Sequence, residues 1–315
     1  MALPLTAKKA LREWRLYFFV LPSVVLVGVF AYFPAASAIY HSLFDWQGGE
    51  AKQFVGWGNF QRALGDRVLW DSFLTVACLI VFNLVKMIPS IATAVVIHRM
   101  RSERSQYVYR VLLVVPMIVP SLVTLFVWKF FFDPNLGLLN RVLDVTGLKS
   151  LLVHVDQLFG WGVFAFDAPV GWLSQPELVL PALFLWGFPW VGAVGVLIYL
   201  AGLQSIGPEI YEAAELDGIG PFQKFFHIEL PLIVTQVRIS LTLLIVSTVQ
   251  GYGLQLLLLG DAGGPAGRGM TPGLWMYNRA FIAGEFGYAC AVGIILFVFI
   301  LLLTLVNNRY VSARS

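Results

Sequence analysis

The polar residues with the most regular spacing in this 315-residue chain lie between two long apolar segments. The pattern reads Glu-Ala-Ala, three residues, Gly, nine residues, Ile-x-Leu-Pro, and its positions are Glu212, Ala213, Ala214, Gly218, Ile228, Leu230 and Pro231. Carboxylates such as Glu212 and Asp217 can pair with basic groups, while the small Ala213 and Ala214 leave a helix thin enough to enter a groove. These residue types predict docking against another protein rather than catalysis.

Proline and glycine define the elements that would position this motif. Pro208 suits the first turn of a helix, and Gly218 suits its C-terminal cap. A second short helix is expected to begin at Pro221 and to stop at Pro231. On spacing alone, an ordinary solvated hairpin explains the segment equally well.

A second polar group lies inside an apolar segment. Thr248, Tyr252 and Gln255 are spaced i, i+4 and i+7, which predicts one hydrogen-bonding stripe on a helix. Gly251 and Gly253 beside them loosen a helix. Such a stripe would suit the path of a polar solute, although packing against a helix of another subunit uses the same residue types.

Aromatic rings and one lysine extend this candidate path. Trp186 and Trp190 flank Pro189, and their flat faces could cover a sugar ring, while bulky packing beside a proline kink is the alternative. Lys86 lies deep in another apolar segment and needs a partner or a wet cavity. That partner would be backbone carbonyls, Asn83, water or another subunit, unless the segment boundary is misplaced.

Composition identifies the elements that must hold these groups. The chain is 58% hydrophobic and only 12% charged, against about a quarter charged in soluble proteins. A helix that crosses a bilayer needs roughly 20 apolar residues. Six stretches qualify, and they are residues 16–40, 74–97, 111–132, 178–203, 232–259 and 286–306. We therefore expect an all-α integral membrane protein, a bundle of about six transmembrane helices in the lipid bilayer.

Basic residues predict the orientation of the bundle. They gather before the first span and in the second loop, at Lys8, Lys9, Arg12, Arg15, Arg99, Arg101, Arg104 and Arg110. Such residues favour the cytoplasmic side, so both terminal segments, 1–15 and 308–315, and the loop with the Glu-Ala-Ala motif should be cytoplasmic. A signal peptide cleaved near Ala36-Ser37-Ala38 is the competing interpretation, but its removal would leave five spans.

The sequence carries no sign of catalytic chemistry. It lacks the glycine-rich phosphate-binding pattern and any histidine and cysteine cluster with metal-ligand spacing, so no cofactor is expected on this chain. The net charge of +3 is explained by arginines of the inner face, so no nucleic-acid partner is implied. If the chain moves solute at the expense of ATP, another polypeptide must hold the nucleotide.

The motif resembles the cytoplasmic loop by which permease subunits of ABC importers engage their ATPase, and it matches at every position. Three further stretches are similar to the carbohydrate-uptake group of these permeases, which handles maltose-like sugars and glycerol phosphates. They are Ser42-Leu43-Phe44-Asp45-Trp46 with Phe54 to Phe60, Trp128 to Asn140, and Gly263-Gly264-Pro265 to Ala291. Tyr211 before the motif and Gly220-Pro221-Phe222 after it resemble the maltose-F-type subunit.

This resemblance implies a type-1-like transmembrane domain over residues 16–307, with a cytoplasmic coupling helix between spans four and five. It implies two copies of an ATPase subunit that bind ATP and Mg²⁺, a second and unlike permease, and an extracytoplasmic solute-binding protein. The expected function is import of a sugar or sugar-like solute by alternating access across a bacterial or archaeal inner membrane. An importer of a non-sugar solute and an ion-coupled secondary transporter are the alternatives.

Two departures from the group's pattern stand out. Asp71-Ser72-Phe73 occupies the start of span two, where the group commonly has an Asn-Thr pair. An apolar and aromatic insert runs from Leu151 to Trp172. It would lie at the outer membrane interface, touch a binding protein, or fold as a packed outer loop.

Overall fold

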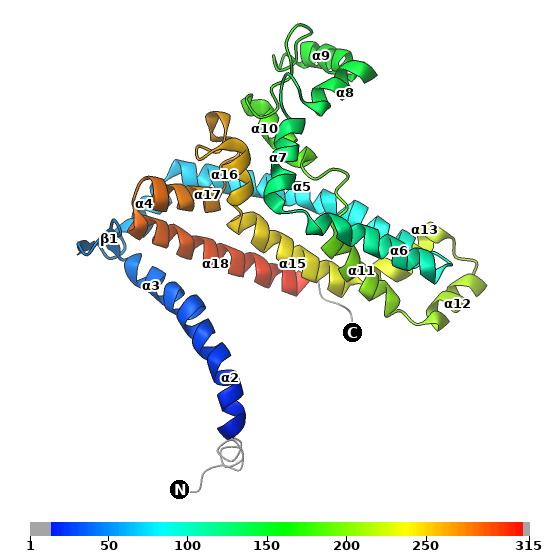
Figure 1. Ribbon diagram of the computed structural model, residues 1–315, viewed down its shortest axis with the longest axis horizontal. Helices are drawn as coiled ribbons and strands as arrows, with labels where there is room; N and C mark the ends of the chain where they lie inside the picture. The colour runs from blue at the N-terminus through cyan, green and yellow to red at the C-terminus, as the bar shows by residue number, and fades with distance from the viewer. Residues whose placement is uncertain (1–13, 311–315) are drawn as a thin grey trace. The chain divides into compact units, whose positions relative to one another are not determined.

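The computed structural model describes residues 14–310 and is mostly helical (Figure 1). The chain divides into two compact units, which for the described residues are 14–66 with 276–295, and 67–275 with 296–310. Parts of the predicted terminal segments 1–15 and 308–315 lie outside the described residues. The side of the membrane on which the termini lie therefore stays a prediction.

The first unit begins with a continuous helical run. It comprises α2 (Trp14–Val27), η1 (Gly28–Tyr32) and α3 (Phe33–His41). The run is followed by a hairpin of β1 (Phe44–Trp46) and β2 (Lys52–Phe54), which pair antiparallel with Phe44 opposite Phe54. The helix α4 (Gly58–Gly65), η5 (Asn278–Ile282) and the first part of α18 (Phe286–Tyr310) complete the unit.

Side chains from distant parts of the sequence hold the first unit together. Asn59 donates from Nδ2 to the carbonyls of Ser42 and Phe44, both at 2.9 Å. Arg62 pairs with Glu285 at 2.8 Å. A Cβ on Gly287 would lie 2.0 Å from the carbonyl oxygen of Phe44, so only glycine permits this approach. Two of the stretches that carry the family resemblance therefore meet in one small unit.

The second unit is built around α5 (Arg67–His98), a helix of 32 residues. Such a helix is about 48 Å long, well beyond the roughly 30 Å of a bilayer's hydrocarbon core. It packs against α10 (Pro176–Leu185), α11 (Ala193–Gln204) and α15 (Val234–Gln250). The residues buried there are apolar on both sides of the contact, for example Ala94, Val196 and Tyr199.

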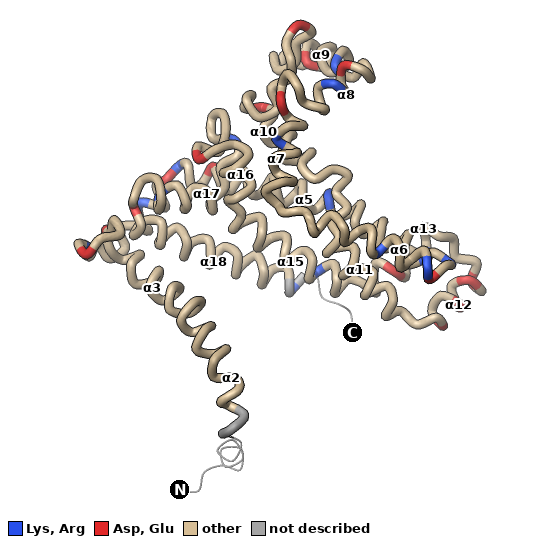
Figure 2. Tube along the Cα trace, in the orientation of Figure 1, with Lys and Arg blue, Asp and Glu red and all other residues tan. Residues whose placement is uncertain are grey.

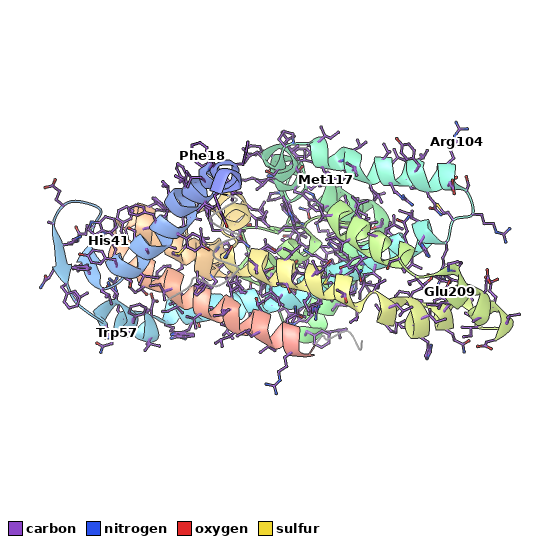
Figure 3. All side chains as sticks on the ribbon, turned by 90° about the horizontal axis from the view of Figure 1, so that it is seen from below. Phe18, His41, Trp57, Arg104, Met117 and Glu209 are labelled. Atoms are coloured by element: carbon purple, nitrogen blue, oxygen red, sulfur yellow. The ribbon has the colours of Figure 1, made fainter. Side chains whose placement is uncertain are left out.

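The remaining helices of the second unit are shorter. They are α6 (Glu103–Val114), η2 (Val115–Ile118), α7 (Ser121–Phe131), α8 (Leu138–Thr146), α9 (Leu148–Phe159), α12 (Pro208–Leu216), α13 (Pro221–Lys224), η3 (Phe225–Glu229), α14 (Leu230–Leu232), α16 (Gly253–Leu259), η4 (Pro265–Gly267) and α17 (Pro272–Tyr277). Charged residues are sparse along α15 and gather around α12 and α13 (Figure 2). Arg104 and Glu209 lie at this same end of the unit (Figure 3).

Three helices are individually long and apolar enough to cross a bilayer: Tyr17–His41, Arg67–His98 and Phe286–Asn307. Three further pairs pass only if each bent pair counts as one span, bent by 86°, 74° and 68°. They are Glu103–Ile118 with Ser121–Phe131, Ala193–Gln204 with Pro208–Leu216, and Pro221–Leu232 with Val234–Gln250. Length and composition of the described residues thus give three to six spans, with six as the upper number.

Three of the predicted spans are not continuous helices, and prolines and glycines explain the breaks. Segment 111–132 breaks at Val119–Pro120, because proline cannot donate to the preceding turn. Segment 178–203 loses its helix between Leu185 and Ala193, around Gly187 and Pro189. Segment 232–259 breaks between Gln250 and Gly253, where Gly251 is extended.

The aromatic insert folds into a small layer with α8. Asn140 is buried and donates from Nδ2 to the carbonyls of Pro134 and Val170, while its Oδ1 accepts a bond from Trp172 Nε1 at 2.8 Å. Buried Asp156 accepts bonds from two backbone amides of the loop that follows it. Trp172 is therefore packed, whereas Trp161 is 56% exposed and stacks on Phe159.

Candidate functional site

The Glu-Ala-Ala motif forms the short helix α12, as its prolines and glycines predict. Pro208 occupies the first turn, and Gly207 is extended before it. Gly218 ends the helix in the left-handed region with φ +68°, which glycine adopts without steric cost. Its amide donates to Glu215 O at 3.1 Å, and the next amide, of Ile219, donates to Ala214 O at 3.0 Å. Backbone geometry therefore fixes where α12 stops.

The two alanines of the motif differ in burial. Ala214 is only 2% exposed and packs inward, so of the two alanines only Ala213 lies on the surface of the helix. The prediction that these small residues let the helix enter a groove stays a prediction. Glu212, Ala213, Asp217 and the 90%-exposed Leu216 lie on the outward face. We call this exposed set, Glu212, Ala213, Leu216 and Asp217, the outer face of α12. It combines an apolar side chain with two carboxylates.

The second half of the motif is one helical run from Pro221 to Leu232, close to the short helix that the sequence predicts, but the run contains a wider turn. Residues 221–232 are divided among α13, η3 and α14, with a wider turn over Phe225–Glu229. Ile228 and Leu230 are half-buried, and Pro231 is exposed. Glu229, the unspecified residue of Ile-x-Leu-Pro, has 0% exposure and is the residue that this turn points inward.

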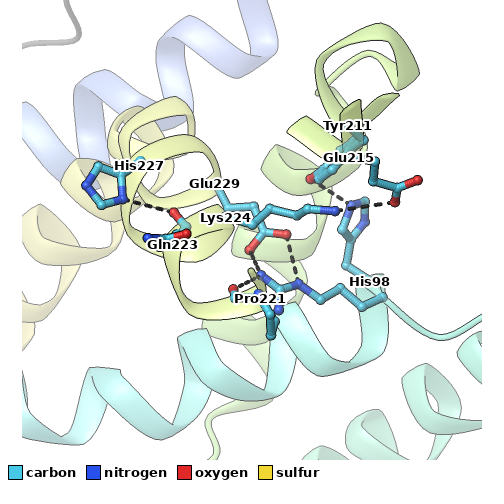
Figure 4. A network of polar contacts seen from close by, with 9 residues as sticks. His98, Tyr211, Glu215, Pro221, Gln223, Lys224, His227 and Glu229 are labelled. Carbon is cyan, nitrogen blue, oxygen red and sulfur yellow. Dashed lines mark hydrogen bonds and ion pairs between the residues drawn. The ribbon is translucent and has the colours of Figure 1, made fainter. Parts of the chain in front are cut away.

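An ion pair with a partly exposed arginine accounts for that buried carboxylate (Figure 4). Arg99, which directly follows α5, donates from Nε to Glu229 Oε1 at 3.0 Å and from Nη2 to Oε2 at 2.7 Å. Nη2 also donates to Pro221 O at 2.9 Å. A bidentate pair of this kind fixes orientation as well as charge, because the planar guanidinium matches the carboxylate. In the sequence, Arg99 indicates only the orientation of the bundle, and Glu229 was not among the predicted site residues.

Two further contacts join α12 to this junction. His98 Nε2 lies 3.0 Å from the hydroxyl oxygen of Tyr211 on α12, and Lys224 Nζ lies 3.4 Å from Glu215 Oε1. The space between these contacts is about 370 Å³ and is lined by His98, Arg99, Tyr211, Glu215, Ile219, Pro221 and Lys224. A larger cavity, of about 450 Å³, lies elsewhere in the second unit. The inner side of α12 is therefore tied to the end of α5.

The larger cavity lies between α5, α11, α15 and the non-helical segment 186–192. Its polar and aromatic lining residues are Asn83, Lys86, Ser90, Trp186, Trp190, Tyr199, Ser240 and Ser247. An adjoining space of about 190 Å³ shares Asn83, Lys86 and Trp186, and adds Thr248 and Gln255. Five of the six path residues predicted from the sequence, all except Tyr252, line these two spaces.

Lys86 does have the backbone partners that its depth requires. Nζ donates to Leu183 O at 2.9 Å and to Trp186 O at 3.2 Å, the carbonyls at the end of α10. A cation is favourable there, because the last carbonyls of a helix carry partial negative charge. The lysine therefore holds the end of a broken helix while its side chain borders both cavities.

The predicted stripe on the fifth span is interrupted. Thr248 lies in α15, but Tyr252 has φ −135° and ψ −29° at the break and does not continue the helix. Thr271 Oγ1 donates to Gly251 O at 2.8 Å, and a Cβ on Gly273 would meet Gln250 O at 2.7 Å. Close approach of the 271–273 segment thus accompanies the break, so i, i+4, i+7 spacing no longer places the three residues on one face.

A different stripe, on α5, was missed. Asn83, Lys86 and Ser90 are spaced i, i+3 and i+7 and face the cavities together. Asn83 donates to Thr248 Oγ1 at 3.0 Å, and Ser90 Oγ accepts the amide of Gly192 at 2.9 Å. The sequence already named Asn83 as a candidate partner of Lys86, and extending the helical spacing to i+4 would have added Ser90.

Comparison with known proteins places this geometry in a family. The chain is 31% identical to the diacetylchitobiose uptake system permease protein of Streptomyces coelicolor, over 93% of this chain and 82% of that protein. It is 29% identical to the trehalose/maltose transport system permease protein of Thermococcus litoralis, over 96% and 95%. These similarities confirm the resemblance to carbohydrate-uptake permeases.

The fold is also that of a solved transporter. A chain of the bacterial alginate ABC transporter, crystallised in complex with an alginate pentasaccharide-bound periplasmic protein, superposes with a TM-score of 0.75 at 20% identity. The match covers 96% of this chain and 95% of that one. A family model described as the binding-protein-dependent transport system inner membrane component matches residues 90–314. The chain therefore belongs to the family of inner-membrane components of binding-protein-dependent transport systems.

Proposed function

We propose that this chain is one half of a permease pair that imports a sugar or sugar-like solute by alternating access. Members of its family are membrane permease subunits of ABC importers, and ATP is hydrolysed on a separate subunit. The observation that carries the proposal is the polar and aromatic lining of the two joined cavities around Lys86. Small-molecule sites typically combine such a lining with a few convergent polar groups.

The lining supplies the groups that a carbohydrate needs. Asn83, Ser247 and Thr248 provide amide and hydroxyl groups, and Trp186 provides a flat apolar face. The Oε1 atom of buried Gln255 has no hydrogen-bond donor among the described residues. A solute hydroxyl that donated to this acceptor would remove the cost of leaving it unpaired.

The partners follow from the same proposal. Two ATPase subunits, which hold ATP and Mg²⁺, would engage the outer face of α12, with the exposed Leu216 entering an apolar groove and Glu212 and Asp217 meeting basic groups. A second and unlike permease would complete the path, and an extracytoplasmic solute-binding protein would deliver the solute. The bundle would have six spans in a bacterial or archaeal inner membrane, with both termini cytoplasmic.

The test is purification of the tagged chain from its native membrane in mild detergent, with mass spectrometry of what remains bound. Recovery of a P-loop ATPase and a second permease supports the proposal. Absence of both, while the chain stays folded, would favour an ion-coupled secondary transporter. ATP-dependent uptake by the reconstituted complex, with maltose, diacetylchitobiose and glycerol 3-phosphate as probes, then separates sugar from non-sugar import.

A further inference from the structure

One helix contacts both polar regions of the second unit. Ser90 of α5 donates from Oγ to Trp190 O at 3.1 Å and accepts the amide of Gly192. Together with Lys86, it holds the 186–192 segment and the end of α10 by main-chain atoms. Trp190 has φ +61°, in the left-handed region that residues other than glycine rarely adopt. The hydrogen bonds from Ser90 hold the backbone at and just after Trp190 in this conformation.

The opposite end of the same helix contacts α12. His98 is the last residue of α5, and Arg99 remains bonded to its final turn through its amide, which donates to Val95 O at 3.0 Å. Ser90 and Arg99 are nine residues apart, about 14 Å along a helix. A rigid helix over that distance moves both ends together.

The contacts that hold the end of α5 to η3 and to α12 resist separation. Glu229 is fully buried, so a carboxylate pulled away from Arg99 would be left charged and unpaired. Outside the membrane, as proposed for α12, burial of the phenol, reinforced by nearby Glu229, raises the pKa of Tyr211 to about 12. The protonated hydroxyl can donate to His98 Nε2 in the tautomer that carries its proton on Nδ1.

We propose that Arg99, Glu229 and Tyr211 are positioning residues that lock the motif to the end of α5, Tyr211 through α12 and Glu229 through η3. Movement of α12 would then be transmitted through α5 to the 186–192 wall of the cavity. The inference rests on the proposed function, because it assumes that α12 receives the movement of an ATPase. None of the three residues lies on the outer face of α12. Their loss should therefore spare ATPase binding and impair its coupling to transport.

The experiment uses the complete complex in proteoliposomes and measures solute imported per ATP hydrolysed. The variants are Arg99→Gln, Tyr211→Phe and the double variant Arg99→Gln/Glu229→Gln, in which no buried charge is stranded. Arg104→Gln is the matched control, because Arg104 is an exposed arginine at the start of α6, five residues after Arg99. We expect at least a tenfold lower ratio for the two Arg99 variants, about threefold lower for Tyr211→Phe, and no change for the control, with ATPase recovery as in the wild type.

The outcomes separate this inference from the proposed function. If wild-type chain recovers no ATPase, the docking function fails, and the transmission role fails with it. If ATPase binds and the double variant and Tyr211→Phe both keep the wild-type ratio, docking stands and the transmission role is overturned. If Arg99→Gln alone does not assemble, the double variant and Tyr211→Phe decide the question. A pair that served only assembly would leave the ratio of solute to ATP unchanged in any variant that assembles. A lower ratio in a variant that does assemble therefore supports the transmission role.

Discussion

Replacement of Gly218 by valine should uncouple ATP hydrolysis from transport without removing the bundle. Gly218 ends α12 at φ +68°, and a Cβ added there would meet nothing within 4 Å. The cost is therefore confined to the backbone. A side chain forced into this region costs about 1–3 kcal/mol, with β-branched residues at the upper end.

A cost of about 2 kcal/mol corresponds to roughly a 30-fold shift of the local equilibrium away from the capped end. The atoms displaced would be the amides of Gly218 and Ile219, which donate to Glu215 O and Ala214 O. Ile219 also borders the space between α12 and α5. The capped end of α12 is only one of several contacts between this helix and the rest of the unit, so its loss should reduce coupling by less than the full 30-fold. We therefore expect the solute imported per ATP hydrolysed to fall by about tenfold.

The assay is ATPase activity and uptake measured on the same proteoliposomes. Gly218→Asn serves as a chemical control, because asparagine tolerates the left-handed region. Gly220→Val serves as a positional control, because Gly220 has φ −70° and ψ 164° with open space around it, and valine suits extended backbone. Full coupling in Gly218→Val, or an equal loss in Gly220→Val, would refute the backbone argument.

The other predictions address three separate regions. Leu216→Asp should leave the fold of the chain unchanged, because Leu216 is 90% exposed. It should weaken binding of the ATPase roughly 10- to 100-fold, since burial of one leucine side chain contributes about 1.5–3 kcal/mol. Titrated co-purification measures this loss. Lys86→Met should lower uptake at least tenfold with assembly intact, since two carbonyls at the end of α10 lose their donor; unchanged uptake and assembly would remove Lys86 from the path. Asn140→Ala should lower the local stability of the 160–172 segment by about 3 kcal/mol, roughly 1 kcal/mol for each of three hydrogen bonds. Amide hydrogen exchange in residues 160–172 should then be about 100-fold faster. The exposed Asn135→Ala is the control and should leave the exchange rates unchanged.

Local signals in the sequence were enough for the candidate docking helix and for part of the cavity. Pro208 and Gly218 act within one or two turns, so the ends of α12 could be predicted without knowledge of any neighbour. The depth of Lys86 in an apolar run required a polar partner, and carbonyls were among the partners expected. The identity of those carbonyls, Leu183 and Trp186, depends on packing across nearly a hundred residues of sequence.

By itself the sequence determined that this is an apolar helical membrane protein with a polar motif in one loop, because length, hydrophobicity and proline or glycine placement are local properties. Tertiary structure decided which polar groups work together. It broke the Thr248 stripe at Gly251 through the approach of residues 271–273, turned Ala214 inward, and paired Glu229 with Arg99. Those outcomes depend on contacts between segments far apart in the chain, and helical spacing within one segment carries no information about them.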